Sequence, residues 1–229
     1  MKKPTLIDFL DSSVLPMSLL LPYPPSGPLM IFGAGGHGRV VADSALLMGG
    51  WSEVLASDRN PDSCKGELLA GVSLRPPPET PLSESMTMHI AIGNNFARQQ
   101  EAEFWGYDCL ASVVHPAAVV SSFSKVGTGC FVAAGAVVGP AASLGAGVIV
   151  NHGAVVDHDV EVGAFSHIAP NAALGGHVKT GKRVLVGAGA VILPLKVIGD
   201  DVTIGAGTVV NRDLLEPGVY AGIPVRKIQ

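Results

Sequence analysis

Polar side chains that can exchange protons gather in one short part of an otherwise apolar stretch. Asn151-His152 comes first, Asp157-His158-Asp159 follows, and Ser166-His167 closes the segment. The ordinary pKa of imidazole lies close to neutral pH, so a neutral histidine can accept a proton from a reacting group. The segment from 151 to 167 is therefore a place where acid–base chemistry could occur.

A second candidate site is defined by the absence of side chains. Gly33-Ala34-Gly35-Gly36-His37-Gly38 follows an apolar strand expected at 29–32 and precedes a helix expected over 39–48, and Asp58 ends the next strand. This is the glycine turn of a nucleotide-binding βαβ unit, in which bare N–H groups face a phosphate. Only about 80 residues separate Leu29 from Ala111. The unit is thus half a Rossmann fold, sized for one nucleotide diphosphate and not a dinucleotide.

The polar segment lies within a repeat of period six that runs from Val114 to Leu215. Sixteen of the seventeen sixth positions are Val, Leu or Ile, and Thr180 is the exception. A hexapeptide period predicts a parallel β-helix in which three hexads close one coil of eighteen residues. Residues eighteen apart then stack about 4.8 Å apart, which places Gly176 over His158.

These patterns divide the chain into an N-terminal extension, an α/β domain, a β-helix and a C-terminal segment. The expected bounds are 1–28, 29–112, 113–215 and 216–229. The extension has acidic residues and prolines inside its apolar run, so we expect neither a signal peptide nor a transmembrane segment. A further helix is expected over 96–105, and a closing strand over 108–113.

Composition excludes some classes of protein. The 229 residues carry a net charge of −4, which is unlike a nucleic-acid-binding surface. The three cysteines are an odd number without metal-ligand spacing. They indicate reduced thiols in a cytoplasmic protein, and we expect no metal.

The chain resembles bacterial hexapeptide-repeat sugar acetyltransferases. The resemblance rests on Gly-Ala-Gly-Gly-His-Gly, on Ile-Gly-Asn-Asn before the second helix, on the His115-Pro116 junction and on the hexapeptides, and it covers about residues 29–229. The chain is similar to nucleotide-4-aminosugar N-acetyltransferases of the bacillosamine and perosamine pathways and to sialic acid O-acetyltransferase-like proteins. The family implies a Rossmann-like domain followed by a left-handed β-helix, acetyl-CoA as co-substrate, a nucleotide-linked sugar as acceptor and a homotrimer with interfacial active sites. It also implies a place in cell-surface polysaccharide biosynthesis.

The resemblance implies a role for each matching residue. His158 corresponds to the catalytic base, Asp159 to the acidic residue after it, and Gly176 to the oxyanion donor. Asp at position 159 replaces the Glu of some members and has a shorter reach. The acceptor is expected to contact Gly33, Gly35, Gly36, His37, Asp58, Asn94, Asn151 and His167. Acetyl-CoA is expected to contact His167, Gly176, Gly187, Ala188, Gly205 and Ala206.

Several assignments stay open at this point. The basic residues available for the phosphates of coenzyme A are Lys179, Lys182, Arg183, Arg226 and Lys227. The residues expected to be only solvated or structural are His89, His115, His152, Asp157 and Asn171. The favoured activity is N-acetylation of a nucleotide-linked 4-amino-4,6-dideoxysugar. The alternatives are O-acetylation of a sialic-type or other sugar hydroxyl, an NAD-binding protein and a non-catalytic β-helix, and the sugar and its nucleotide base (UDP, GDP or dTDP) stay undetermined.

Overall fold

The computed structural model describes residues 27–78 and 86–229, so residues 1–26 of the predicted extension lie outside the described residues. The α/β domain contains a five-stranded sheet in the order β3-β4-β2-β1-β5, parallel except for the β3–β4 pair. Its strands are β1 (Pro28–Phe32), β2 (Glu53–Ser57), β3 (Glu67–Leu69), β4 (Val72–Leu74) and β5 (Thr87–Ile90). Its helices are α1 (Gly36–Met48) and α2 (Asn95–Trp105), with short 3-10 turns at Pro61–Ser63 and Tyr107–Cys109.

The closing strand predicted over 108–113 does not form as such. Gly106 ends α2 with a positive φ of 93°, and the chain then makes the second 3-10 turn. Only Leu110 bridges to β5, at Met88. Val113 instead donates its N–H to the carbonyl of Cys130 in the next coil, so this end of the segment already belongs to the β-helix.

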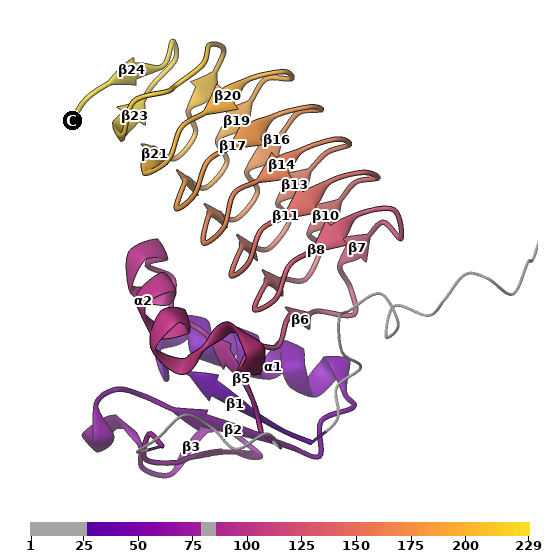
Figure 1. Cartoon of the computed structure of the whole chain (residues 1–229), viewed down its shortest axis with the longest axis vertical. Helices are drawn as coiled ribbons and strands as arrows, with labels where there is room; N and C mark the ends of the chain where they lie inside the picture. The colour runs from indigo at the N-terminus through magenta and orange to yellow at the C-terminus, as the bar shows by residue number, and fades with distance from the viewer. Residues whose placement is uncertain (1–26, 79–85) are drawn as a thin grey trace, which may run out of the picture.

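The second domain is a left-handed parallel β-helix whose coils build three flat sheets (Figure 1). The first face contains β6 (Val113–Val114), β9 (Phe131–Val132), β12 (Ile149–Val150), β15 (His167–Ile168), β18 (Leu185–Val186), β21 (Val202–Ile204), β23 (Gly218–Ala221) and β24 (Arg226–Lys227). The second face contains β7 (Val119–Val120), β10 (Val137–Val138), β13 (Val155–Val156), β16 (Ala173–Leu174), β19 (Val191–Ile192) and β22 (Val209–Val210). The third face contains β8 (Lys125–Val126), β11 (Ser143–Leu144), β14 (Glu161–Val162), β17 (Lys179–Thr180) and β20 (Val197–Ile198).

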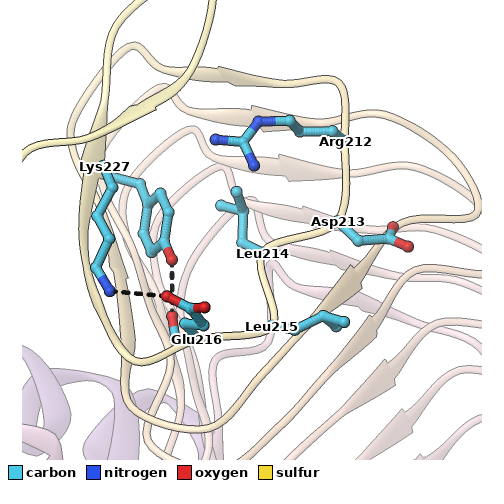
Figure 2. Close-up of a pocket in the computed structure, with 7 residues that line it drawn as sticks. Arg212, Asp213, Leu214, Leu215, Glu216 and Lys227 are labelled. Atoms are coloured by element: carbon cyan, nitrogen blue, oxygen red, sulfur yellow. Dashed lines mark hydrogen bonds and ion pairs between the residues drawn. The ribbon is translucent and has the colours of Figure 1, made fainter.

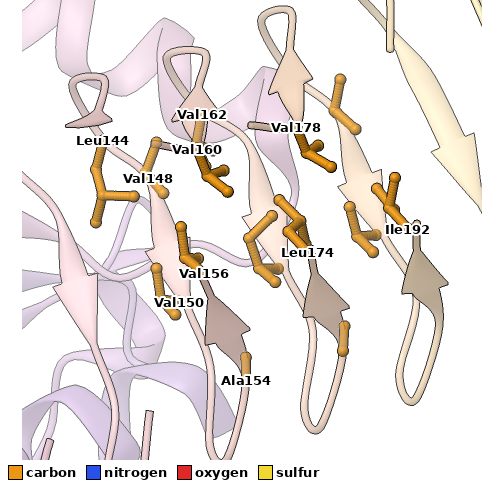
Figure 3. Packing of buried hydrophobic residues seen from close by; sticks show 14 of the residues in the cluster. Leu144, Val148, Val150, Ala154, Val156, Val160, Val162, Leu174, Val178 and Ile192 are labelled. Carbon is orange, nitrogen blue, oxygen red and sulfur yellow. The ribbon is translucent and has the colours of Figure 1, made fainter. Parts of the chain in front are cut away.

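The register between neighbouring coils is the predicted eighteen residues. Ile149 pairs with His167, and Val155 pairs with Ala173. The second residue of each two-residue strand from β6 to β22 points inward, and these side chains form one continuous core (Figure 3). Burying each Val, Leu or Ile contributes about 1.5–3 kcal/mol. Thr180 fits this core because its hydroxyl accepts the N–H of Gly163 at 3.2 Å, which satisfies the buried polar group.

The corners between faces are short loops whose third residue adopts the left-handed conformation. At the first corner, between the first and second faces, glycine usually occupies this position, as at Gly135 and Gly153. At the second corner, between the second and third faces, non-glycine residues occupy it: Ala141, Asp159, His177 and Leu195. A non-glycine residue in this region is uncommon and costs free energy. The second corner therefore projects a column of side chains where the first corner projects few.

The small domain packs on the first face at the N-terminal end of the coils (Figure 1). Val113, Phe131 and Ile149 of the first face share a core with residues of β1, β2 and α1. Arg98 of α2 is 1% exposed and donates to the carbonyls of Gly147 and Phe165 in the β-helix at 2.8 and 2.7 Å. Burial lowers its pKa to about 9, which leaves the guanidinium charged at neutral pH. Among the residues that the structure describes, this charge has no carboxylate partner, and its hydrogen bonds join the two domains.

At the other end, β23 and β24 cover the last coil. Residues 212–216, with Tyr220 and Lys227, line a pocket there (Figure 2). Lys227 Nζ lies 3.3 Å from Glu216 Oε2, and the Tyr220 hydroxyl donates to the Glu216 carbonyl at 2.9 Å. In the part of the chain that the structure describes, no helix is long and apolar enough to cross a membrane.

Candidate active site

The His158-Asp159 pair lies at the second corner, in the loop between β13 and β14. His158 Nδ1 is 2.8 Å from Asp159 Oδ2, and both side chains are about half exposed, at 50% and 45%. Asp159 reaches the ring from a left-handed backbone with φ 58°. Asp157 supports the loop because its Oδ1 accepts the N–H of His158 at 2.7 Å. The strained position of Asp159 thus directs its carboxylate at the imidazole.

This geometry selects one form of the His158 ring. If Nδ1 carries the hydrogen that Asp159 accepts, Nε2 keeps a free lone pair and can accept a proton. The hydrogen bond to Asp159 raises the pKa of His158, helped by the charges of Asp157 and Asp159. The arrangement can act as a general base whose protonated form is stabilised by the neighbouring carboxylate.

Gly176 lies one coil further along, directly against the His158 ring. A Cβ built at position 176 would come within 2.5 Å of both Cε1 and Nε2 of His158, so only glycine leaves room for the ring. The N–H of Gly176 has no acceptor among the described residues. The equivalent corner positions are His158 one coil before, Pro194 one coil after and Pro140 two coils before, and the two prolines have no N–H at all. The fold therefore does not use this N–H as a donor within the described residues, and Gly176 lies buried beneath the His158 ring.

The glycine loop contains two kinds of glycine. A Cβ at Gly33 or at Gly38 would clash with backbone oxygens, at 2.8 Å from Ala91 and at 2.0 Å from Gly33 respectively, so packing requires these two. A Cβ at Gly35 or Gly36 would meet nothing within 4 Å. The chain itself thus gives no reason for these two glycines at the N-terminus of α1, a place where bare N–H groups can bind an anion.

Asp58 and Asn94, both predicted to contact the acceptor, brace loops in this structure. Asp58 Oδ2 accepts the N–H of Ala34 at 2.9 Å, and its Oδ1 accepts the N–H of Asn60 at 3.0 Å. Asn94 caps α2 by accepting the N–H of Ala97 at 2.9 Å. Asp58 therefore holds the glycine loop in shape.

A second group of polar residues lies where the glycine loop meets the first face. The His37 ring packs against Phe131 at 5.3 Å between centroids and lies 6.4 Å from the ring of His167. Asn151 Nδ2 is 3.1 Å from His167 Nε2. Burial, assisted by nearby cations including Arg98, lowers the pKa of His37 to about 3 and that of His167 to about 4. His37 Nε2 is buried with no partner in the described residues.

The structure separates the predicted site residues into these two groups. His158, Asp159 and Gly176 lie at the second corner, which joins the second and third faces and is therefore opposite the first face. The small domain, with His37, covers the first face. The residues expected to contact coenzyme A lie mostly on the first corner of later coils: Gly187, Ala188, Gly205 and Ala206. One chain alone does not bring the glycine loop to His158.

The candidate basic residues differ in how they are paired. Lys179 pairs with Glu161 at 2.7 Å, Arg183 with Asp201 at 2.6 Å, and Lys227 with Glu216. Within residues 27–78 and 86–229, Lys182 and Arg226 have no ion pair. Sequence reasoning missed Arg98, because a single arginine in a polar helix gives no signal that it will be buried.

Comparison with known proteins assigns the family. Residues 28–103 match the family model described as the PglD N-terminal domain. The acetyltransferase domain of PglB from Neisseria gonorrhoeae FA1090 is 36% identical, with a TM-score of 0.82 over 88% of this chain and 99% of that one. The same domain in complex with acetyl coenzyme A matches at 34% identity, with a TM-score of 0.81 over 89% and 100% of the two chains.

A third solved structure matches over nearly the same length. PerB from Caulobacter crescentus, in complex with CoA and GDP-perosamine, is 33% identical, with a TM-score of 0.79 over 89% of this chain and 98% of that one. With these identities over almost the whole of each relative, and with the coils and glycine loop described above, this chain belongs to the hexapeptide-repeat acetyltransferases of nucleotide-linked amino sugars.

Proposed function

We propose that this enzyme transfers the acetyl group of acetyl-CoA to the amino group of a nucleotide-linked 4-amino-4,6-dideoxysugar. The observation that carries the proposal is the His158 ring, held by Asp159 on one side and placed against Gly176 on the other. The complexes of PglB with acetyl coenzyme A and of PerB with CoA and GDP-perosamine support the two substrate classes.

The reaction follows from the atoms around His158. The amine nitrogen attacks the thioester carbonyl carbon, and Nε2 of His158 takes the amine proton as the C–N bond forms. A base of this kind contributes about 10²–10⁴-fold in rate. The oxyanion would accept the N–H of Gly176, an interaction worth about 2.7–4 kcal/mol when removed. Collapse breaks the C–S bond, and the leaving thiolate takes the proton from the imidazolium.

We propose that the acceptor's nucleotide binds the glycine loop. The open space at Gly35 and Gly36 and the uncapped start of α1 support this assignment. Replacing Gly35 with leucine should raise the KM for the nucleotide sugar and leave the KM for acetyl-CoA nearly unchanged. An equal rise in both constants would overturn the assignment.

The active site is then shared between subunits of a homotrimer. His158 lies opposite the face that its own small domain covers, so another subunit must bring the glycine loop to it. The outer side of the second face supports close packing between subunits because it presents a column of apolar side chains: Val119, Val137, Val155, Ala173, Val191 and Val209. Light scattering should give the mass of a trimer, and a monomer at micromolar concentration would contradict the shared site.

One measurement identifies the reacting group of the acceptor. A panel of UDP-, GDP- and dTDP-linked 4-aminosugars with acetyl-CoA, compared with matched hydroxyl sugars, should give turnover only with an amine. Turnover only with hydroxyl sugars would reassign the enzyme as an O-acetyltransferase.

Cys64, Cys109 and Cys130 are all free, which supports a reducing, cytoplasmic location.

A further inference from the structure

His177 extends the His158-Asp159 pair by one coil. It occupies the same left-handed corner position as Asp159, eighteen residues later. His177 Nε2 lies 3.8 Å from Asp159 Oδ2, the oxygen that is also 2.8 Å from His158 Nδ1. The two imidazole rings are nearly perpendicular, with centroids 5.2 Å apart. Two nitrogens and one oxygen therefore converge within 4.8 Å of one another at an exposed corner.

We propose that His158, Asp159 and His177 form a binding site for a divalent transition metal such as Zn²⁺, and that the bound metal switches off the base. Zinc binds His nitrogen at about 2.0–2.1 Å and carboxylate oxygen at about 2.0–2.2 Å in a tetrahedron, which requires ligand atoms roughly 3.4 Å apart. The oxygen of Asp159 is 2.8 and 3.8 Å from the two nitrogens, and the three side chains are exposed, so they are free to rotate towards these separations. Two imidazoles favour zinc over Mg²⁺ or Ca²⁺, which prefer oxygen ligands.

The effect on the base follows from the tautomers of imidazole. Coordination through Nδ1 uses the lone pair of that nitrogen, so the single hydrogen of the neutral His158 ring must move to Nε2. Nε2 then has no lone pair to accept the amine proton. The metal also occupies Asp159, which can no longer support the imidazolium. This inhibitory effect rests on the proposed role of His158, whereas metal binding itself does not.

The binding test uses the full chain without substrates. Titration of the wild type with ZnCl₂ in a calorimeter should show one zinc site per chain at this corner. Loss of even an outer-shell partner costs about 10–100-fold in metal affinity, so His177→Gln should weaken this zinc binding at least about tenfold. His152→Gln removes another exposed histidine at a different corner and should leave it unchanged. Equal zinc affinity in the wild type and His177→Gln, or no binding by the wild type, would overturn the site.

The activity test separates binding from its consequence. With a chelator present, His177→Gln should turn over close to the wild-type rate. With added ZnCl₂, wild-type turnover should fall and recover on chelation, and His177→Gln should need at least about tenfold more zinc for the same loss. Zinc binding without inhibition would keep the site and overturn the switch. Inhibition equal in both proteins would overturn the involvement of His177.

Discussion

Two groups of histidines lie on opposite sides of the β-helix and in opposite surroundings. His37, His89 and His167 lie where the small domain meets the first face, and burial lowers their pKa values to about 3, 4 and 4. His158 is exposed at the second corner, and its hydrogen bond to Asp159 raises its pKa. The buried histidines are neutral but weak bases at pH 7. Of these four histidines, only His158 combines a raised pKa with an exposed ring, and this difference in surroundings supports the proposal that His158 is the base.

The contact between His158 and Gly176 provides the test with the largest expected effect on the exposed site. In Gly176→Ala the new Cβ would lie 2.5 Å from the imidazole, so the ring must leave its place beside the N–H of Gly176. Alanine keeps the N–H, so we expect kcat to fall by about 10²–10⁴-fold at most, the scale of losing a well-placed general base. Steady-state kinetics measure the loss, and an unchanged Tm shows that the coil is intact. A wild-type kcat would mean that this contact plays no part in catalysis.

The stability of the domain interface that buries the other histidines should depend on Arg98. In Arg98→Leu the carbonyls of Gly147 and Phe165 lose their donor, and each unpaired buried acceptor costs about 1–3 kcal/mol. The free energy of unfolding in urea should therefore fall by about 3 kcal/mol or more. The control is Arg59→Leu, which removes an exposed ion pair with Glu101 worth at most about 1 kcal/mol. Equal losses in both variants would show that Arg98 does not hold the domains together.

The sequence predicts the exposed corner of the β-helix better than it predicts the domain interface. The period of six predicts the register, and with it the stacking of Gly176 on His158, because a β-helix converts spacing along the chain directly into position. The domain interface follows no such rule. The burial of Arg98 and the packing of His37 on Phe131 depend on contacts between the two domains, whereas the pairing of Lys179 with Glu161 follows from the eighteen-residue register. The closing strand expected over 108–113 is wrong because residues 107–109 form a 3-10 turn and Val113 already pairs with Phe131 in the register of the coils.

The buried histidines should make the fold sensitive to acid. In the unfolded chain they bind protons with an ordinary pKa of about 6.5, well above their folded values of about 3 to 4. The unfolded state then binds more protons, so the free energy of unfolding falls as pH falls from about 6.5 towards 4. Urea midpoints at pH 7.5 and 5.0 measure the loss, and His37→Phe should show a weaker dependence. A flat profile would contradict the buried, neutral state.

Asp159→Asn should lower kcat at the exposed site by a smaller factor. The ring keeps a neighbour but loses a carboxylate, so kcat should fall by less than about 10²-fold. Because that carboxylate raises the pKa of His158, the acidic limb of the kcat/KM profile should move to lower pH. Its effect should not add to that of His158→Ala, since the two residues act as a unit. An acidic limb at an unchanged pH would show that Asp159 does not affect the pKa of the titrating group.

The most direct test of His158 as the base is a single-turnover measurement on His158→Ala, with acetyl-CoA bound before the nucleotide sugar is mixed in. The rate of acetyl transfer should fall about 10²–10⁴-fold, while the Kd for acetyl-CoA stays close to the wild-type value. His167→Gln, which changes a buried histidine of the other group, should lose less. A wild-type transfer rate in His158→Ala would contradict the account and move the search for the base to His167 or His37.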